Sequence, residues 1–347
     1  MSVILFKKLN VLVLAAVAVA FFIGGWTVNN KYFSSRKEEN EKPMALRLGG
    51  YKYTSPLLLC DANSNKQSVS LNSLKNRLQN VVNNEIKNKN ITTASIYFRD
   101  LKSGGQVDIN SDEKFYPSSL RKVPLMIAVF KAAEANPGQL DKLTVIFKDP
   151  DQNIGQEIKP ADFAKKDKTY TLSNLLEKMV KYSDNNATFV FTNLLGIDSI
   201  KTIYNDLQVP FLVPSSNSSS SAEIDFMTTN KFAFFFRILY NSTYLNGDLS
   251  EKALKLLTDT DFKDGLVAGV PQGTVVAHKF GLTSLGDKHG NIASRELHDC
   301  GIVYYPDNPY LVCVMTKSTA DIPHVEKTIS NISAAAYQEF TNILKNR

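Results

Sequence analysis

A serine and a lysine three residues apart, Ser119 and Lys122, form a pair that could carry nucleophilic chemistry. On a helix, side chains three residues apart share a face. The lysine amine can then take the proton of the serine hydroxyl, provided that the pKa of the lysine is lowered. The spacing therefore indicates a serine acyl-transfer site, if the surroundings of the pair allow it.

The S-x-x-K spacing by itself does not select Ser119, because it also occurs at Ser34–Lys37 and Ser111–Lys114. Ser34 lies in a polar stretch and Ser111 in a charged turn. Ser119 begins an apolar helix, expected over about residues 119–135, directly after a strand hairpin and Phe115-Tyr116-Pro117. A serine at a helix start can also be a simple N-cap. The setting nevertheless favours Ser119, because only this serine is expected to be buried.

Two short elements later in the chain add polar groups of the kind such a site needs. Ser183-Asp184-Asn185 lies in a break between two predicted helices, and Lys279-Phe280-Gly281 lies on a predicted strand that ends at the glycine. Each has a simpler explanation when taken alone, namely helix capping for the first and a surface lysine for the second. The order in which these two elements follow the serine–lysine pair is a more specific signal of a site than either element alone.

In this order of elements the sequence resembles the class A β-lactamases and the wider penicillin-recognising serine enzymes, whose motifs are S-x-x-K, S-D-N and K-T-G. The resemblance covers about residues 68–347. It rests on four segments: ASIYFRDLKSGGQVDIN, YPSSLRK, MVKYSDNNATFVFTNLLG and GTVVAHKFGLTS.

The resemblance implies a role for each matching residue. Ser119 would attack a carbonyl, Lys122 would act as the base or its partner, and Ser183 would pass a proton to the leaving nitrogen. Asp184 is expected to be structural. The implied substrate-binding residues are Asn185 for the substrate amide, Lys279 for positive potential beside Ser183, Gly281, Thr283, and Leu282, whose backbone N–H would form the oxyanion hole with that of Ser119.

The sequence departs from this family pattern at two places. The E-x-x-L-N segment, whose glutamate activates the water that releases the acyl group in class A β-lactamases, is absent. The corresponding stretch, residues 209–226, offers only Glu223, Asp225 and Asn217 besides its serines. Phe280 stands where the family usually has a hydroxyl residue that helps to bind the substrate carboxylate. Thr283 or Ser284 could replace that hydroxyl.

The periodicity of apolar residues predicts an α+β (α/β) fold. Helical spacing is expected over 71–86, from Leu172, over about 187–195 with a stop at Gly196, and from about His324. Alternating patterns predict strands over 94–99, 273–281, 300–305 and 310–315. Helices between strands at both ends favour one antiparallel sheet with an inserted helical lobe. The resemblance implies five strands, flanked by helices.

The N-terminal region predicts export across a membrane. An apolar run from Val11 to Val28 follows Lys7 and Lys8 and is about as long as a bilayer requires. It is interpreted as a signal anchor, with a cleaved signal peptide as the alternative. The expected organisation is therefore an anchor or signal segment over 1–28, a polar spacer over 29–67 and the catalytic domain over 68–347.

The net charge, the spacing of the histidines and the number of cysteines argue against several other classes of function. The net charge of +6 is modest and spread along the chain, so no nucleic-acid partner is expected. The four histidines show no metal-ligand spacing, so neither a metal nor a cofactor is expected. His278 is interpreted as an ordinary strand residue. The chain has three cysteines, Cys60, Cys300 and Cys313. Three is a small and odd number for a disulfide framework, so we expect them to be buried free thiols.

The sequence thus predicts a membrane-tethered extracytoplasmic serine hydrolase. A β-lactam or a cell-wall peptide would acylate Ser119, and deacylation would be slow because the E-x-x-L-N glutamate is missing. The main alternative is a weakly active or inactive module that binds peptidoglycan fragments or a protein partner. Another hydrolase chemistry on the same fold, such as amide hydrolysis, also stays open.

Overall fold

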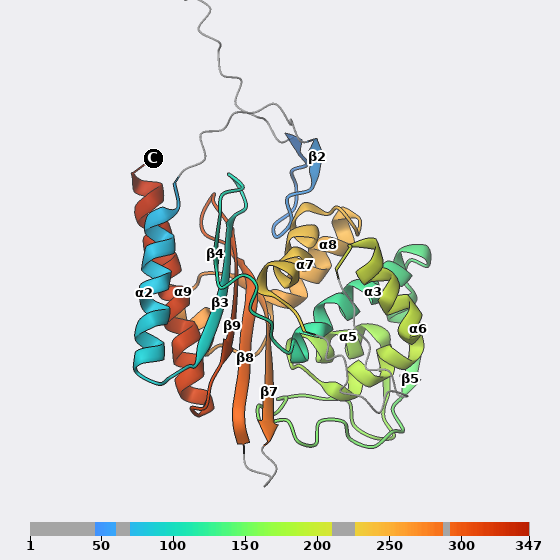
Figure 1. The fold of residues 1–347 in the computed structure, drawn as a ribbon. Helices are drawn as coiled ribbons and strands as arrows, with labels where there is room; N and C mark the ends of the chain where they lie inside the picture. Colours follow the sequence, from blue (N-terminus) through green and yellow to red (C-terminus); the bar gives the residue numbers. More distant parts are fainter. Residues whose placement is uncertain (1–45, 60–69, 210–225, 287–291, 347) are drawn as a thin grey trace, which may run out of the picture. The chain divides into compact units, whose positions relative to one another are not determined.

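A five-stranded antiparallel sheet forms the centre of the fold in a computed structural model that describes residues 46–59, 70–209, 226–286 and 292–346 (Figure 1). The strand order is β4-β3-β9-β8-β7, so β7 is an edge strand. The five strands are β3 (Thr93–Asp100), β4 (Gln106–Ile109), β7 (Val276–Gly286), β8 (Ile292–Val303) and β9 (Tyr310–Lys317).

Helices cover both faces of this sheet (Figure 1). On one face, α2 (Asn72–Lys87) and α9 (Ile322–Lys345) enclose one apolar cluster. On the other face lies a helical lobe with a second cluster. The lobe contains η1 (Ser118–Arg121), α3 (Lys122–Ala135), α4 (Gln139–Lys142), α5 (Leu172–Lys181), α6 (Asn185–Asp206), α7 (Thr229–Asn241), α8 (Gly247–Thr258) and the short strands β5 (Thr144–Ile146) and β6 (Thr169–Thr171). The expected fold class, with its five strands and helical lobe, is confirmed.

Apolar spacing explains the two helices on the α2–α9 face. Leu74, Leu78 and Val82 are fully buried on α2 at intervals of four residues. On α9, buried residues recur at helical spacing from Val325 to Phe340. Asp321 caps this helix by accepting from the backbone N–H of His324 at 3.2 Å. Both helices therefore follow the sequence prediction closely.

Several predicted boundaries differ from the structure, among them the following three. Strand β7 does not end at Gly281 but continues to Gly286, because β8 pairs with it over this whole length. The helix expected to stop at Gly196 bends there, with φ 70° and ψ 160°, and α6 continues to Asp206. Ser119 lies in the 3-10 turn η1 rather than in the α-helix, which begins at Lys122.

Part of the expected spacer packs on the domain expected over 68–347. The described residues of 47–58 and 70–346 form one compact unit. Tyr53 is only 9% exposed and contacts the ring of Tyr304 edge-on. The carboxylate of Glu251 on α8 accepts from the backbone N–H groups of residues 52, 53 and 54. We call residues 47–58 the N-terminal strap; it includes parts of β1 (Leu46–Arg47) and β2 (Leu57–Leu59).

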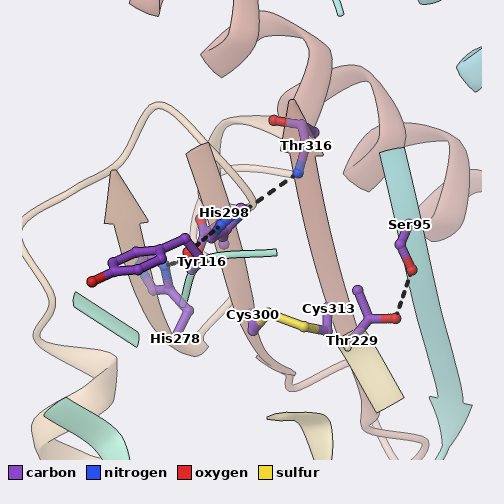
Figure 2. Close-up of a disulfide and its surroundings, with 9 residues drawn as sticks. Ser95, Tyr116, Thr229, His278, His298, Cys300, Cys313 and Thr316 are labelled. Carbon is purple, nitrogen blue, oxygen red and sulfur yellow. Dashed lines mark hydrogen bonds and ion pairs between the residues drawn. A yellow bond between two sulfur atoms is a disulfide. The ribbon is translucent and has the colours of Figure 1, made fainter. Parts of the chain in front are cut away.

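Two of the cysteines form a disulfide, which corrects the expectation of free thiols (Figure 2). Cys300 on β8 lies directly opposite Cys313 on β9 in the sheet register, and both are fully buried. Cysteine number and sequence separation could not show this, because the pairing follows from strand register. Cys60 lies outside the described residues.

The apolar run from Val11 to Val28 also lies outside the described residues. Within the part of the chain that the structure describes, no helix has the length and apolar character needed to cross a bilayer.

Candidate active site

The amine of Lys122 lies at the centre of a compact polar cluster. Its Nζ is 3.0 Å from the Oγ of Ser119 and 3.0 Å from the Oγ of Ser183. It also donates to the Ser183 carbonyl at 2.6 Å and to the Oδ1 of Asn185 at 2.8 Å. An ammonium has three N–H donors for these four oxygens, whereas a neutral amine can accept a proton from a hydroxyl. The structure therefore joins the two predicted serines through one amine.

The surroundings of Lys122 favour the neutral amine. The side chain is almost completely buried, and its residue is 3% exposed. Burial, followed by the nearby charge of Lys279, lowers the pKa of Lys122 well below its ordinary value. A lysine with a lowered pKa can act as a general base near neutral pH.

The turn that carries Ser119 is held directly against the edge strand β7. Ser118 adopts a left-handed φ of 51° and donates its hydroxyl to the Leu282 carbonyl at 2.6 Å. A Cβ on Gly281 would lie 2.9 Å from the Pro117 carbonyl oxygen and 3.2 Å from the backbone nitrogen of Ser119. Only glycine allows this approach without displacement of the turn.

The two N–H groups expected to form the oxyanion hole lie on the two segments that this contact joins, the turn and β7. In an antiparallel strand, the N–H and C=O of one residue point to the same side. The carbonyl of Leu282 points toward the turn, because it accepts from Ser118. The N–H of Leu282 therefore also points toward the turn that carries Ser119. A carbonyl oxygen activated at Ser119 would lie near two backbone donors.

The predicted structural role of Asp184 has a clear basis. Its carboxylate is fully buried and caps α6 by accepting from the N–H groups of Asn186 and Ala187. It also accepts from the N–H of Ala164 at 2.9 Å and from the Nδ2 of Asn153 at 2.8 Å. These bonds hold the segment that presents Ser183, whose φ of 61° is left-handed. Strain of this kind persists only where the surroundings fix the backbone.

Lys279 is fully buried on β7, and burial lowers its pKa to about 7. Its Nζ donates to the Phe280 carbonyl at 3.2 Å and lies 4.2 Å from the centroid of the Phe280 ring. The positive charge of Lys279 contributes to the lowered pKa of Lys122. Among the described residues, however, no hydrogen bond joins Lys279 to Ser183.

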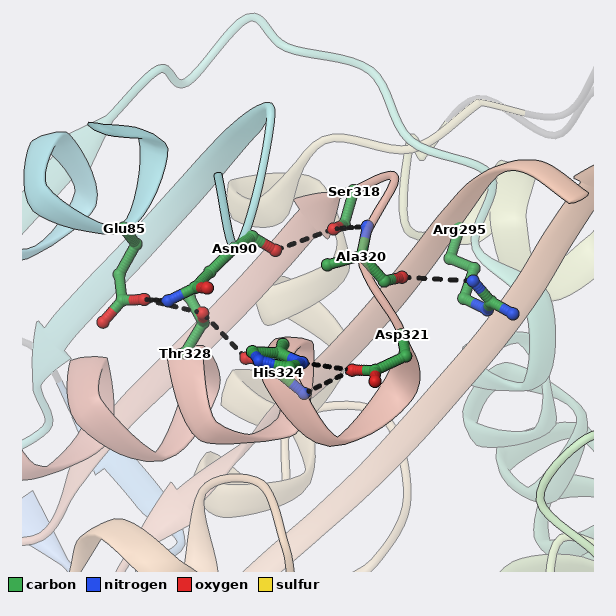
Figure 3. Close-up of polar contacts among 8 residues, drawn as sticks. All are labelled: Glu85, Asn90, Arg295, Ser318, Ala320, Asp321, His324 and Thr328. Carbon is green, nitrogen blue, oxygen red and sulfur yellow. Dashed lines mark hydrogen bonds and ion pairs between the residues drawn. The ribbon is translucent and has the colours of Figure 1, made fainter. Parts of the chain in front are cut away.

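Phe280 does not supply a polar group to the site, and Ser284 is already engaged. The Phe280 ring stacks on Phe262 with centroids 4.4 Å apart. The Ser284 hydroxyl donates to Glu157, whose carboxylate also pairs with Arg295 at 3.3 Å. Arg295 is held in turn by the Ala320 carbonyl (Figure 3). Of the two hydroxyl residues proposed to replace the missing threonine, only Thr283 has its hydroxyl outside this network.

The loop between β5 and β6 supplies three residues that sequence reasoning missed. Asn153 is buried, and its Oδ1 accepts from the backbone N–H of Asn185 at 2.8 Å. Gln156 donates to the Ser183 carbonyl at 3.4 Å, and Glu157 joins the loop to β7 and β8. The stretch Asp149-Pro150-Asp151 looks like an ordinary turn, so only the tertiary structure reveals its place at the site.

Two cavities meet at Ser119. One, of about 330 Å³, lies between β7 and the β5–β6 loop, and Ser119, Ser183, Asn185, Leu282 and Thr283 are among its wall residues. The other, of about 410 Å³, has more apolar walls, among them Leu125, Ile197, Ile200 and Tyr204. The structure thus places all of the predicted polar site residues either in the walls of one cleft or next to its wall residues. Their catalytic and binding roles stay predictions, and Glu223, Asp225 and Asn217 lie outside the described residues.

The fold and the serine–lysine cluster define a protein of the serine β-lactamase-like class. The chain belongs to the Beta-lactamase enzyme family, which it matches over residues 73–340. The family resemblance inferred from the motifs is therefore confirmed.

Solved structures share this fold. A mutant of PBP-A, solved as an acyl-enzyme complex with penicillin G, is 24% identical with a TM-score of 0.64, and the match covers 78% of this chain and 97% of that one. The TLA-3 extended-spectrum β-lactamase is 19% identical with a TM-score of 0.66 over 78% and 99% of the two chains. A class A β-lactamase from Mycobacterium abscessus is 19% identical with a TM-score of 0.63 over 77% and 99%. At these identities the likeness shows the fold.

Proposed function

We propose that this protein is a serine acyl-transfer enzyme that is acylated at Ser119 by a β-lactam or a cell-wall peptide. The observation that carries the proposal is the position of the Lys122 amine, 3.0 Å from both the Ser119 and the Ser183 hydroxyl oxygens. The lowered pKa of Lys122 supports its role as the base.

The acylation step uses the cluster as a proton path. Lys122 takes the proton of the Ser119 hydroxyl while the Ser119 oxygen bonds to the substrate carbonyl carbon. The carbonyl oxygen becomes negative and accepts from the N–H groups of Ser119 and Leu282. The carbon–nitrogen bond then breaks, and the leaving nitrogen receives a proton from the Ser183 hydroxyl, which Lys122 restores. The products are an acyl ester on Ser119 and an amine.

Release of the acyl group is expected to be slow. The E-x-x-L-N segment is absent from the sequence. Among the described wall residues of the two cavities, the one carboxylate belongs to Glu157, which is bound to Ser284 and Arg295. A carboxylate held in this way is a poor base for the attacking water. A mutant of PBP-A was solved as an acyl-enzyme complex with penicillin G.

The test is the intact mass of the protein with time after addition of benzylpenicillin. The expected result is an adduct that forms on the wild-type protein, persists for many minutes and is absent from Ser119→Ala. Rapid return to the free mass together with product formation would instead indicate an efficient β-lactamase.

A binding module that does not acylate is the second candidate. Phe280 favours it, since the phenyl ring offers no hydroxyl to a substrate carboxylate and stacks on Phe262. The absence of an adduct with benzylpenicillin at any concentration, combined with binding of peptidoglycan fragments to the wild-type protein, would support this candidate against the enzyme.

We further propose that the domain acts outside the cytoplasm, tethered by the apolar run from Val11 to Val28. The Cys300–Cys313 disulfide supports an oxidising compartment. The test is the response of cells that express the full chain to added protease and to alkaline extraction of membranes. Digestion of the domain from outside, with resistance to extraction, is expected for a tether; a soluble domain in the cytoplasm would contradict it.

A further inference from the structure

Two buried side chains of β8, Glu296 and His298, hold the backbone three residues before the nucleophile. Glu296 Oε2 accepts from the N–H of Tyr116 at 2.7 Å. His298 Nε2 lies 3.0 Å from the carbonyl oxygen of Tyr116 (Figure 2). Both backbone polar groups of Tyr116, its N–H and its C=O, are therefore satisfied by side chains of the sheet rather than by a strand partner. Glu296 and His298 are two residues apart, so they lie on the same face of β8.

The hydrogen bonds define which nitrogen of His298 carries the proton. The backbone N–H of Thr316 on β9 donates to Nδ1 at 3.3 Å, which makes Nδ1 an acceptor. Nε2 therefore carries the proton and donates it to the Tyr116 carbonyl. Complete burial lowers the pKa of His298 to about 4, so the ring keeps this neutral form at neutral pH.

The position of His298 in the sheet explains how it reaches the nucleophile segment. His298 pairs in register with Gly281 of β7. Because Gly281 has no side chain, the segment that leads to Ser119 can lie against the sheet at this point. The ring of Phe115 packs edge-on against the imidazole, with centroids 5.4 Å apart. The imidazole thus supports the segment by packing as well as by its hydrogen bond.

We infer that Glu296 and His298 are positioning residues for acylation, which fix the backbone of Tyr116 and through it the Ser119 hydroxyl and N–H relative to β7. This inference rests on the proposed acylation at Ser119. Among the described residues, no hydrogen bond joins either side chain to Ser119, so each acts through the backbone between Tyr116 and the turn. A displacement of about 1 Å at a reacting group can cost about 100-fold in rate.

The chain offers a matched control for His298. His278, one strand away on β7, is equally buried and bonded to Asp299 through its Nδ1 at 2.8 Å. Its other ring nitrogen, Nε2, has no hydrogen-bond partner among the described residues, so no such bond joins this ring to Tyr116. His278→Leu and His298→Leu should therefore both destabilise the fold, but only the second should disturb the nucleophile turn.

The experiment compares the wild-type protein, His298→Leu, His298→Gln and His278→Leu in their reaction with benzylpenicillin. The acylation rate constant at saturation and the dissociation constant of the initial complex are measured separately. His298→Leu is expected to lower the rate constant by about 10- to 100-fold and to change the dissociation constant by less than about threefold. His298→Gln keeps an N–H donor and should recover most of the rate. Equal losses in His298→Leu and His278→Leu would overturn the inference.

Glu296 has an analogous pair of variants. Glu296→Gln keeps an oxygen that accepts from the Tyr116 N–H and should keep most of the acylation rate, whereas Glu296→Leu should lose it. Equal rates in these two variants would contradict a positioning role for Glu296.

A second measurement separates this inference from the proposed function. Hydrogen–deuterium exchange of the peptide over residues 115–122 needs no acylation. Faster exchange there in His298→Leu, but not in His278→Leu, is expected even if benzylpenicillin never reacts. Absence of an adduct would then count against the proposed function alone, and unchanged exchange would overturn the positioning role.

Discussion

At the scale of single residues, the proposed acylation depends on a neutral amine in a buried site. Lys122→Met removes the base but fills a similar volume. We expect the acylation rate with benzylpenicillin to fall by about 100- to 10,000-fold. In the wild-type protein the rate should fall as the pH drops through the lowered pKa of Lys122, because protonation removes the lone pair that takes the serine proton. Lys131→Met, which removes an exposed lysine paired with Glu134, should leave both the rate and its pH profile unchanged.

The second buried lysine should appear in the pH dependence of stability. The pKa of Lys279 is about 7 in the folded protein and about 10.4 in the unfolded chain. Between these values the unfolded state binds more protons, so stability rises with pH. The free energy of unfolding of the wild-type protein, relative to Lys279→Met, should therefore increase by about 4 kcal/mol from pH 7 to pH 10. Urea unfolding of both proteins at several pH values measures this difference in the free energy of unfolding. A difference that stays constant or falls with pH would contradict a pKa of Lys279 lowered by burial.

At the scale of elements, the close contact between η1 and β7 assembles the site. Gly281→Ala would place a methyl group 2.9 Å from the Pro117 carbonyl and 3.2 Å from the Ser119 nitrogen. The turn must then move away from the strand, and we expect at least about tenfold slower acylation with benzylpenicillin. Gly49→Ala is the matched control, because a Cβ there meets no atom within 4 Å. An unchanged rate in Gly281→Ala would show that the contact is not required.

The disulfide between β8 and β9 gives an element-scale prediction that needs no substrate. Titration of the unfolded, unreduced protein with a thiol reagent should find one free thiol per chain, that of Cys60, out of three cysteines. Replacement of both Cys300 and Cys313 by alanine should lower the free energy of unfolding by about 2–4 kcal/mol. Three reactive thiols in the untreated protein would restore the free-thiol interpretation.

At the scale of the whole molecule, the N-terminal strap belongs to the folded domain. A shortened chain that begins at Ser68 loses Tyr53 from the core and leaves the Glu251 carboxylate without its three backbone donors. We expect this chain to be less stable than one that begins at Leu46, by about 2–5 kcal/mol. Thermal unfolding of both chains measures the difference. Equal melting temperatures would mean that the strap is only a spacer, as the sequence suggested.

The segments of the candidate site were predictable because their signals are local. The serine–lysine spacing, the Ser183-Asp184-Asn185 break and the glycine on β7 depend on residues next to one another in the chain. The five-stranded sheet and the helical lobe followed from apolar periodicity together with the family resemblance. Even the structural role of Asp184 could be anticipated, since aspartate before a helix is a common N-cap.

The rest was decided by contacts between residues far apart in the sequence. Strand register brought Cys300 opposite Cys313 and His298 opposite Gly281, and no local pattern encodes register. The Lys122 amine could be predicted to need a lowered pKa, but the burial that lowers it comes from packing of the helical lobe against β7. The sequence by itself thus determined which groups can react, through their types and spacing. Tertiary structure alone decided how they are held, because burial and hydrogen-bond geometry exist only once distant segments pack together.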